Sequence, residues 1–396
     1  MSDVLVTSPH GLRRTLILAL GTFAVGTDAY VVAGFLPAMA RSLGVSESAA
    51  GQSATAFAVT YAVLSPVLAT LTSRVPRRPL LVGALLLLAL ANLGSALAPG
   101  YAALMATRVA AAAGAAVFTP NAGAVAAALV APERRARALA VVVGGLTVAT
   151  AVGVPLGNLA GRLLDWRSAL GLVAALCLLA AAGVRAALPP LPGHPRVPLR
   201  ERLATLRRPG VVAVLPLTVL GLAGSYGLYA YTVPLLRALG AGPSAETWLL
   251  VVYGAGAVAG NAVAGTAVDR RGPIPVLATG YAAIALSLAA LAALASLTSA
   301  GHAGVTWLPL TALLMAAWGA STWSQTPAQQ VRLIAAAPRE TAVVVGLNAS
   351  AMYAGIALGT ALGGALLPAG PAVALAVHAA LAVASLGYLL ATRRHR

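Results

Sequence analysis

The chain alternates between long apolar runs and short polar breaks, and the apolar runs are long enough to cross a lipid bilayer. A spanning helix needs about 20 mostly apolar residues. Only helices and closed barrels satisfy their backbone hydrogen bonds in lipid, and the lengths of these runs fit helices. The pattern therefore predicts an all-α membrane protein with twelve transmembrane helices, near residues 15–37, 48–71, 79–98, 101–130, 137–161, 168–188, 210–236, 247–268, 274–298, 305–333, 341–367 and 371–391.

One longer polar stretch separates the first six runs from the last six. Its prolines and arginines are typical of a semi-rigid connection with a short surface helix. We expect an N-terminal six-helix bundle in residues 1–188, a cytoplasmic linker in 189–209 and a C-terminal six-helix bundle in 210–396. Two parallel six-helix halves are one arrangement of secondary transporters, which bind their substrate between the halves near the membrane midplane.

The two halves also echo each other in their glycines. The fifth and eleventh runs each carry a glycine every four residues, at Gly153, Gly157 and Gly161 and at Gly355, Gly359 and Gly363. Small residues at this spacing allow helices to approach closely in a membrane. We expect these glycine ladders to form the smooth surfaces on which one half slides against the other.

Composition supports a membrane protein and excludes two other classes. The chain is 60% hydrophobic and 9% charged, whereas a soluble protein has about 25% charged residues. The net charge of +17 could indicate nucleic-acid binding, but the arginines separate the apolar runs and do not gather on a polar domain. A membrane enzyme would need clustered His, Asp or Glu at membrane depth. We therefore expect no nucleic acid, no enzyme activity, no metal and no cofactor.

The basic residues predict the orientation of the chain. Cytoplasmic loops are enriched in Lys and Arg, and most of the arginines fall in cytoplasmic segments if the N-terminus is inside. The predicted outer loops hold only Arg41, Arg162, Arg167 and Arg237. We expect a multi-pass protein of the plasma membrane, monomeric, with both termini in the cytoplasm. The use of arginine alone, with abundant Ala, Gly and Pro, suggests a GC-rich bacterial genome.

The candidate chemistry is one acidic residue inside the first apolar run. Asp28 is the only acid far from the end of such a run, and intramembrane acids are usually functional. It lies roughly 21 Å from Arg14 at about 1.5 Å per residue, and Arg108 lies roughly 10 Å from Tyr101 in a helix of opposite direction. These depths nearly coincide in a hydrocarbon core about 30 Å thick.

Equal depth would allow Asp28 and Arg108 to contact each other and couple transport to protons, provided that their two helices are neighbours. A nearby arginine favours an ionised aspartate, and dry burial without it favours the protonated form. A conformational change that separates the pair would then capture or release a proton. The alternative is a static ion pair that merely satisfies two buried charges.

With these residues in hand, the chain resembles the major facilitator superfamily over its whole length. The closer likeness is to bacterial drug exporters, including chloramphenicol and arabinose or nucleoside exporters. It rests on the first-run stretch GTDAYVVAGFLP, on Arg108, on the fifth-run motif with Gly153, Pro155, Gly157 and Gly161, and on a loop motif that occurs twice, with Arg74, Arg77 and Arg78 and then with Asp269 and Arg270. The resemblance implies two pseudo-symmetric six-helix bundles, antiport with protons, and loops that latch the halves in one state.

The resemblance also implies a substrate site lined by the first, fourth, seventh and tenth helices. Because it places the first and fourth helices at one cavity, we predict that Asp28 and Arg108 lie within reach of each other. Candidates on these helices are Tyr30, Asn121, Tyr226, Tyr229, Trp318, Trp323 and Gln325. Aromatic side chains with a few amides suit a small amphipathic organic compound, although Trp and Tyr also mark membrane interfaces. The predicted function is proton-coupled export of such a compound, a drug or antibiotic of chloramphenicol type, by alternating access. A sugar or nucleoside exporter of the same fold is the alternative.

Overall fold

The computed structural model describes residues 11–131, 134–193, 198–301 and 307–392, and every regular element in these ranges is helical. The first half contains α1 (Gly11–Tyr30), α2 (Val32–Leu43), α3 (Glu47–Leu71), α4 (Arg77–Ala96), α5 (Tyr101–Ala128), α6 (Arg135–Val148), the π-helical turn η2 (Ala149–Gly153), α7 (Val154–Leu163) and α8 (Trp166–Ala187). The short helix α9 (Leu199–Ala204) and the 3-10 turn η3 (Thr205–Arg207) follow. The second half contains α10 (Pro209–Tyr226), the 3-10 turn η4 (Tyr229–Tyr231), α11 (Thr232–Ala238), α12 (Pro243–Arg271), α13 (Pro273–Ser299), α14 (Leu308–Ala336), α15 (Thr341–Leu366) and α16 (Pro371–Thr392).

These helices account for the twelve predicted membrane crossings. Within the described ranges, ten segments are long and apolar enough to span a membrane, and α1 with α2 makes an eleventh if the bent pair is one span. The twelfth crossing is α14, which has 29 residues. Its second half contains Gln325, Gln329 and Gln330, which keep its hydropathy below that of the ten segments. The predicted all-α fold of two six-helix bundles is confirmed.

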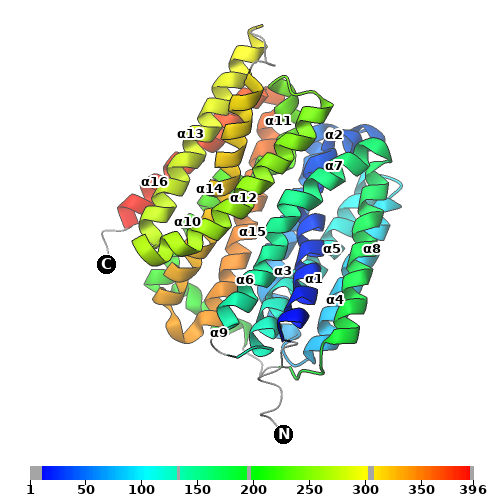
Figure 1. Ribbon diagram of the computed structural model, residues 1–396, viewed down its shortest axis with the longest axis vertical. Helices are drawn as coiled ribbons and strands as arrows, with labels where there is room; N and C mark the ends of the chain where they lie inside the picture. Colours follow the sequence, from blue (N-terminus) through cyan, green and yellow to red (C-terminus); the bar gives the residue numbers. More distant parts are fainter. Residues whose placement is uncertain (1–10, 132–133, 194–197, 302–306, 393–396) are drawn as a thin grey trace.

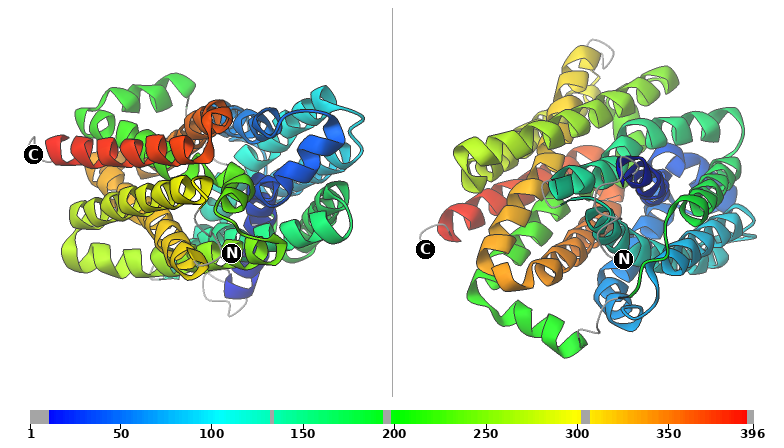
Figure 2. Two further views of the ribbon diagram at one scale, coloured as in Figure 1. Left: turned by 90° about the horizontal axis from the view of Figure 1, so that it is seen from above. Right: turned by 60° about the horizontal axis from the view of Figure 1, so that its bottom comes forward.

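The two halves lie side by side, with their helices running roughly in the same direction (Figure 1). Views from above and from below show the same separation of the first half, blue to blue-green, from the second half, green to red (Figure 2). The halves meet where α3 packs on α15, where α12 packs on η2 and α7, and where α2 packs on α11 and η4. A surface between two bundles therefore runs through the middle of the molecule.

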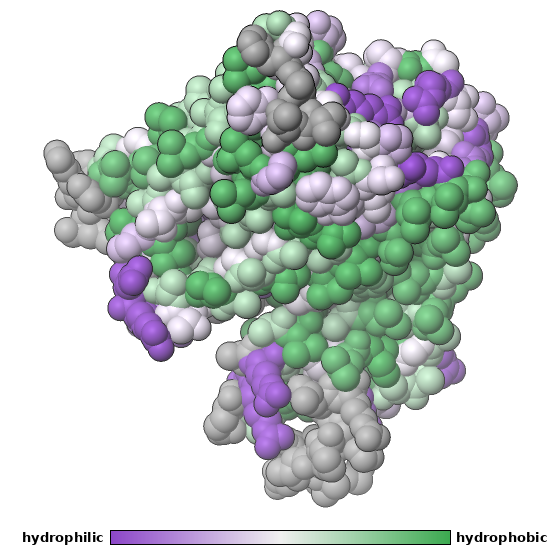
Figure 3. All heavy atoms as spheres, turned by 45° about the horizontal axis from the view of Figure 1, so that its top comes forward, coloured by the Kyte–Doolittle hydropathy of each residue, from purple (hydrophilic) through white to green (hydrophobic). Residues whose placement is uncertain are grey.

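The outside of the molecule is apolar. Large side chains that a soluble protein would bury are exposed on both halves, among them Leu90 at 67% and Leu286 at 71%. In the space-filling view, hydrophobic residues cover most of the side of the molecule and the strongly hydrophilic ones lie toward its ends (Figure 3). Contiguous apolar surface of this kind marks a contact with lipid.

Two of the predicted helices are broken. The first is bent by 43° between α1 and α2, and the seventh changes into the 3-10 turn η4 after Tyr226. The apolar run continues through both breaks, so hydrophobicity alone did not reveal them. The short helix α9 lies between the two halves in sequence, as expected for the linker, but the domain boundaries at 188 and 210 stay predictions.

Candidate functional site

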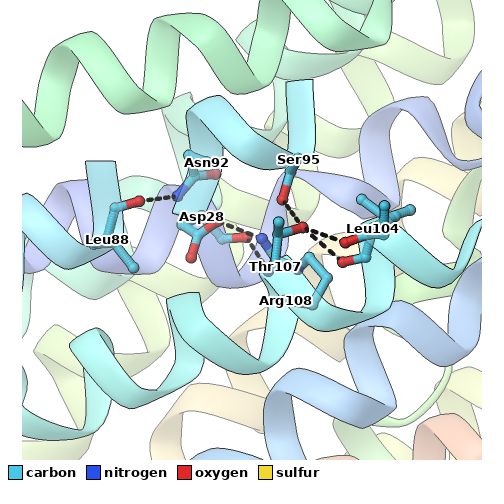
Figure 4. Close-up of polar contacts among 8 residues, drawn as sticks. Asp28, Leu88, Asn92, Ser95, Leu104, Thr107 and Arg108 are labelled. Atoms are coloured by element: carbon cyan, nitrogen blue, oxygen red, sulfur yellow. Dashed lines mark hydrogen bonds and ion pairs between the residues drawn. The ribbon is translucent and has the colours of Figure 1, made fainter. Parts of the chain in front are cut away.

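Asp28 and Arg108 form an ion pair inside the first bundle. Nη1 of Arg108 donates to Oδ1 of Asp28 at 2.5 Å, and both side chains are almost completely buried. The two side chains point toward each other from α1 and α5 (Figure 4). The contact predicted from their depths is confirmed, while its role in proton coupling stays a prediction. A buried ion pair is expensive to desolvate, and removing one partner leaves an uncompensated buried charge.

Arg108 also binds the backbone at the end of α1. Its Nη2 donates to the main-chain carbonyl oxygen of Asp28 at 3.0 Å. The last four carbonyls of a helix have no regular partner, and a cation is favourable at this negative end of the helix dipole. Because α1 ends at Tyr30, a single guanidinium holds both the carboxylate and the bent end of the helix.

The pair touches the wall of a cavity between the two halves. The guanidinium of Arg108 lies over the ring of Phe57, 4.8 Å from its centroid, and Phe57 lines that cavity. The second carboxylate oxygen of Asp28, Oδ2, is buried without a hydrogen-bond partner. Asn92 lies beside Asp28 (Figure 4), and its own side-chain oxygen is also unpartnered. Oδ2 of Asp28 can therefore accept a proton, and both oxygens can accept a hydrogen bond from a water molecule.

An aromatic cluster from both halves surrounds the cavity. Tyr30 is the last residue of α1 and Tyr226 is the last residue of α10, and their ring centroids lie 5.1 Å apart. Tyr229 and Trp323 meet Tyr30 edge to face at 6.4 and 6.3 Å. These four residues were all predicted to bind substrate, and the structure brings them together.

The cavity itself is too small for an organic molecule in this conformation. Its volume is about 20 Å³, which holds about one water molecule. Three of the predicted residues, Tyr30, Tyr226 and Tyr229, line it. Among the described residues its lining includes no charged side chain. An organic molecule could enter only if the two halves moved apart.

The structure adds aromatic residues that the sequence analysis did not select. Tyr353 of α15 lines the cavity and stacks on Tyr61 of α3 with ring centroids 3.7 Å apart. Phe57 lies 6.2 Å from Tyr353 and completes this side of the wall. Tyr353 is the only aromatic residue of α15, a signal that was overlooked because the eleventh helix was not expected to line the site.

Trp318 and Gln325 lie behind the cavity and not on its surface. Both bind Ser225 of α10: Nε1 of Trp318 donates to the carbonyl oxygen at 2.7 Å, and Nε2 of Gln325 donates to the hydroxyl at 2.9 Å. Gln325 keeps an unpartnered buried oxygen. Asn121 is not brought to the cluster either, because its amide oxygen accepts a hydrogen bond from Arg77 at 2.7 Å. These three residues are left out of the proposed substrate site.

The two copies of the loop motif differ in burial. Arg77 is buried, and besides binding Asn121 it donates through Nη2 to the carbonyl oxygen of Ser73 at 3.1 Å. Its backbone N–H donates to Leu191 in the connection between the halves at 2.9 Å. The other predicted motif residues are exposed or half-buried: Arg74, Arg78, Asp269 and Arg270. A role for these residues in latching the halves stays a prediction.

We expected the glycine ladders to lie between the two halves, but each ladder packs within its own half. A Cβ on Gly153 would lie 2.5 Å from Oγ1 of Thr27, and one on Gly157 would overlap Cγ2 of Val31. Gly161 faces Phe35 of α2 in the same way, and Pro155 is buried at the start of α7. The glycines of the second ladder likewise face α10 and the break that follows it. Each ladder therefore packs against the interrupted helix of its own bundle.

Side-chain hydrogen bonds join the two halves at the end of the molecule opposite the start of α1. Thr247 donates to the amide oxygen of Asn158 at 2.6 Å. Thr55 and Thr360 share a hydrogen bond of 2.9 Å, and Ser48 donates to the carbonyl oxygen of Gly364 at 2.6 Å. We call this group of contacts, with Gln52 and Tyr231, the outer gate. These contacts hold the two halves together at this end.

Comparison with known proteins identifies similar sequences. The sequence profile described as Major Facilitator Superfamily matches residues 18–242. The inner membrane transport protein YdhP of Escherichia coli (strain K12) is 32% identical over 376 residues, which are 95% of this chain and 94% of that protein. A chloramphenicol resistance protein of Streptomyces lividans is 37% identical over 269 residues, which are 66% of this chain and 68% of that protein.

Solved structures share the fold. A D-xylose-proton symporter superposes with a TM-score of 0.75 at 17% identity, covering 95% of this chain and 96% of the other. A bacterial homologue of the human lysosomal transporter Spinster, in an inward-facing and occupied conformation, superposes with a TM-score of 0.72 at 16% identity over 98% of both chains. At these identities the likeness concerns the architecture alone.

Proposed function

Because this chain belongs to the Major Facilitator Superfamily, we propose that it is a proton-coupled transporter that exports a small amphipathic organic compound by alternating access. The observation that carries the proposal is the buried pair of Asp28 and Arg108 at the end of α1. Intramembrane ionisable residues facing a bundle interior are typical of proton relays in transporters. The pair is connected to the aromatic cluster through α1, because Asp28 lies two residues before Tyr30 in this helix.

The coupling follows from what Arg108 holds. A proton bound at Oδ2 of Asp28 neutralises the carboxylate and weakens the charge-assisted bond to Arg108. The guanidinium is then bound less tightly at the end of α1, and the bend before α2 can change. Since Tyr30 lies at this bend, the change reaches the cavity wall. Loss of the proton restores the ion pair and the present conformation.

The lining of the cavity favours an amphipathic substrate over a sugar. Its large side chains are aromatic, among them Tyr30, Tyr226, Tyr229 and Tyr353, and such sites bind apolar or aromatic molecules with a few polar anchors. The hydroxyl of Tyr229, which lines the cavity, is buried without a partner and could serve as an anchor. The similarity to a chloramphenicol resistance protein supports a compound of that kind.

The proposal includes an orientation. The protein is a multi-pass membrane protein, and the arginine distribution supports both termini being in the cytoplasm of a bacterial cell. The outer gate then lies on the outer side of the plasma membrane, so the present conformation is closed to the outside. The two halves, residues 1–188 and 210–396, would rock about the central cavity within a monomer, connected by the linker 189–209.

The test is transport into everted membrane vesicles with and without a proton gradient. We expect chloramphenicol-type compounds to accumulate in wild-type vesicles only when the gradient is present. Asp28→Asn should lose gradient-driven accumulation but keep gradient-independent exchange of labelled for unlabelled substrate, because the cavity wall is unchanged. Asp165→Asn, a change of the same charge in the loop before α8, serves as the control.

Two results would refute the proposal. Full gradient-driven export by Asp28→Asn would exclude this carboxylate as the coupling site. Export that ignores the proton gradient in the wild type would exclude proton coupling altogether. Retained exchange by Asp28→Asn shows that the variant is folded, so a loss of accumulation cannot be attributed to misfolding.

A further inference from the structure

A hollow of about 310 Å³ lies in the second half, away from the central cavity. It is formed between α12 and α13, with α14 as its floor, and it shares no lining residue with the cavity of the aromatic cluster. Figure 1 shows α14 between α12 and α13. Its volume is at the lower end of the range for ligand sites, about 300–1,000 Å³. We call it the α12–α13 groove.

Small residues make room for the groove. At Gly260 the backbones of α12 and α14 touch, because a Cβ there would overlap the carbonyl oxygen of Ala320. α12 and α13 are joined by a tight turn at Gly272, whose φ is +80°. Both helices pack against α14, but they make much less contact with each other. They therefore diverge from the turn and leave a wedge open to the membrane.

The length of the groove corresponds to one leaflet of a bilayer. Its lining on α12 extends from Gly260 to Arg271, which is roughly 16 Å at about 1.5 Å per residue. Half of the hydrocarbon core is about 15 Å. The groove thus runs from near the midplane to the membrane surface on the side where α1 begins.

The groove is polar only at its mouth. Three hydroxyl groups lie along it, but each already donates to a backbone carbonyl of its own helix: Thr279 to Pro275, Ser321 to Ala317 and Ser324 to Ser321. The charged group of the lining is Arg271, an exposed residue at the surface end. An apolar channel ending in one guanidinium matches a molecule with an apolar tail and an anionic head.

We propose that the α12–α13 groove binds an anionic phospholipid, with one acyl chain between α12 and α13 and the phosphate at Arg271. Guanidinium groups bind phosphate with two parallel hydrogen bonds. A lipid is the occupant that the position favours, because the groove opens toward the bilayer and its depth matches a single leaflet. The bound chain fills the wedge that the packing of α12, α13 and α14 leaves open.

Native mass spectrometry of the purified, delipidated protein tests this proposal. The probes are phosphatidylglycerol and phosphatidylethanolamine with identical acyl chains, titrated separately. We expect phosphatidylglycerol to bind more tightly, and Arg271→Gln to weaken its binding about fivefold, since one basic residue at a membrane surface contributes about a factor of that size. Arg339→Gln, an exposed arginine after α14 that does not line the groove, should bind as the wild type does.

A second variant tests the position of the acyl chain. Val263 is 64% exposed and lines the groove, so Val263→Trp should cover it without disturbing the core and should lower the affinity for both lipids. Leu286→Trp, at a position that is 71% exposed on α13 outside the groove, is the matched control.

Three outcomes would overturn the proposal. Equal affinity for the two lipids with no effect of Arg271→Gln would remove the assigned headgroup contact. Unchanged binding by Val263→Trp would place the lipid elsewhere. Release of bound phosphatidylglycerol by the exported compound from the wild type would show that the groove is a second substrate site. None of these outcomes depends on whether transport is coupled to protons.

Discussion

Tyr231 is enclosed by glycines from both halves, and this makes the outer gate sensitive to a single methyl group. A Cβ on Gly51 of α3 would lie 2.5 Å from Cζ of Tyr231 and would overlap its hydroxyl. The other edge of the ring packs against Gly363 so closely that a Cβ added there would lie 3.2 Å from it, which leaves the ring little room to move. Its hydroxyl also donates to the carbonyl oxygen of Thr360 at 3.0 Å. Gly51→Ala should therefore force α3 and η4 apart.

The size of the effect follows from the cost of overpacking. Inserting a methyl group into a close-packed site costs about 1–3 kcal/mol. The strain exists only while the outer gate is closed, so it should favour the open conformation about 5- to 150-fold. The variant should remain folded, because alanine is a better helix former than glycine.

Double electron–electron resonance measures this shift directly. Spin labels on cysteines at positions 164 and 369, which are exposed at the outer ends of the two halves, report the opening of the gate. The native Cys177 is buried and is replaced by alanine. We expect Gly51→Ala to add a population with a longer distance. Gly83→Ala, where a Cβ meets nothing within 4 Å, should reproduce the wild-type distribution, and the same distribution in Gly51→Ala would refute the reasoning.

Two further changes test the glycine ladder and the cavity wall. Gly157→Ala should lower the stability of the protein by about 1–3 kcal/mol, because its Cβ would overlap Val31. Adding Val31→Ala should restore most of the loss of thermal stability, and an additive further loss would show that the two residues do not compete for space. Tyr229→Phe removes a buried hydroxyl that has no partner, so it should leave the melting temperature unchanged while it raises the KM for export. An unchanged KM would mean that this hydroxyl does not contact the substrate.

Sequence reasoning located the ion pair because depth in a membrane can be counted along a helix. The distances of Asp28 and Arg108 from their respective helix ends place them at the same level, and the family resemblance places their two helices at one cavity. The tyrosines at the ends of α1 and α10 were found for a similar reason, since their helices line the site in related folds. The number of helices followed from the apolar runs alone.

The direction in which a side chain points could not be inferred from its depth along the helix. Asn121 lies on the expected helix, but its amide binds Arg77 and does not face the cavity. The glycine ladders were assigned to the wrong partner, because spacing shows that a helix has a smooth face and does not show what packs on it. The break at Val31 was invisible, since a bent helix and a straight one bury the same apolar residues.

In the proposed mechanism, the two helix breaks explain why a proton could act on one half only. In each half the helix before the break ends in a tyrosine, and this end is held by a side chain from the fourth helix of the same bundle. In the first half the donor is Arg108, which binds the backbone of Asp28; in the second half it is Trp318, which binds the backbone of Ser225 at 2.7 Å.

The indole N–H is neutral, and Ser225 has no carboxylate for it to pair with. A change in protonation therefore alters the strength of the first contact and leaves the second unchanged. The symmetric fold supplies two matched hinges that meet at Tyr30 and Tyr226, 5.1 Å apart. In the proposed mechanism, the charged pair makes one of these hinges responsive to protons, and the other provides the fixed surface against which it moves.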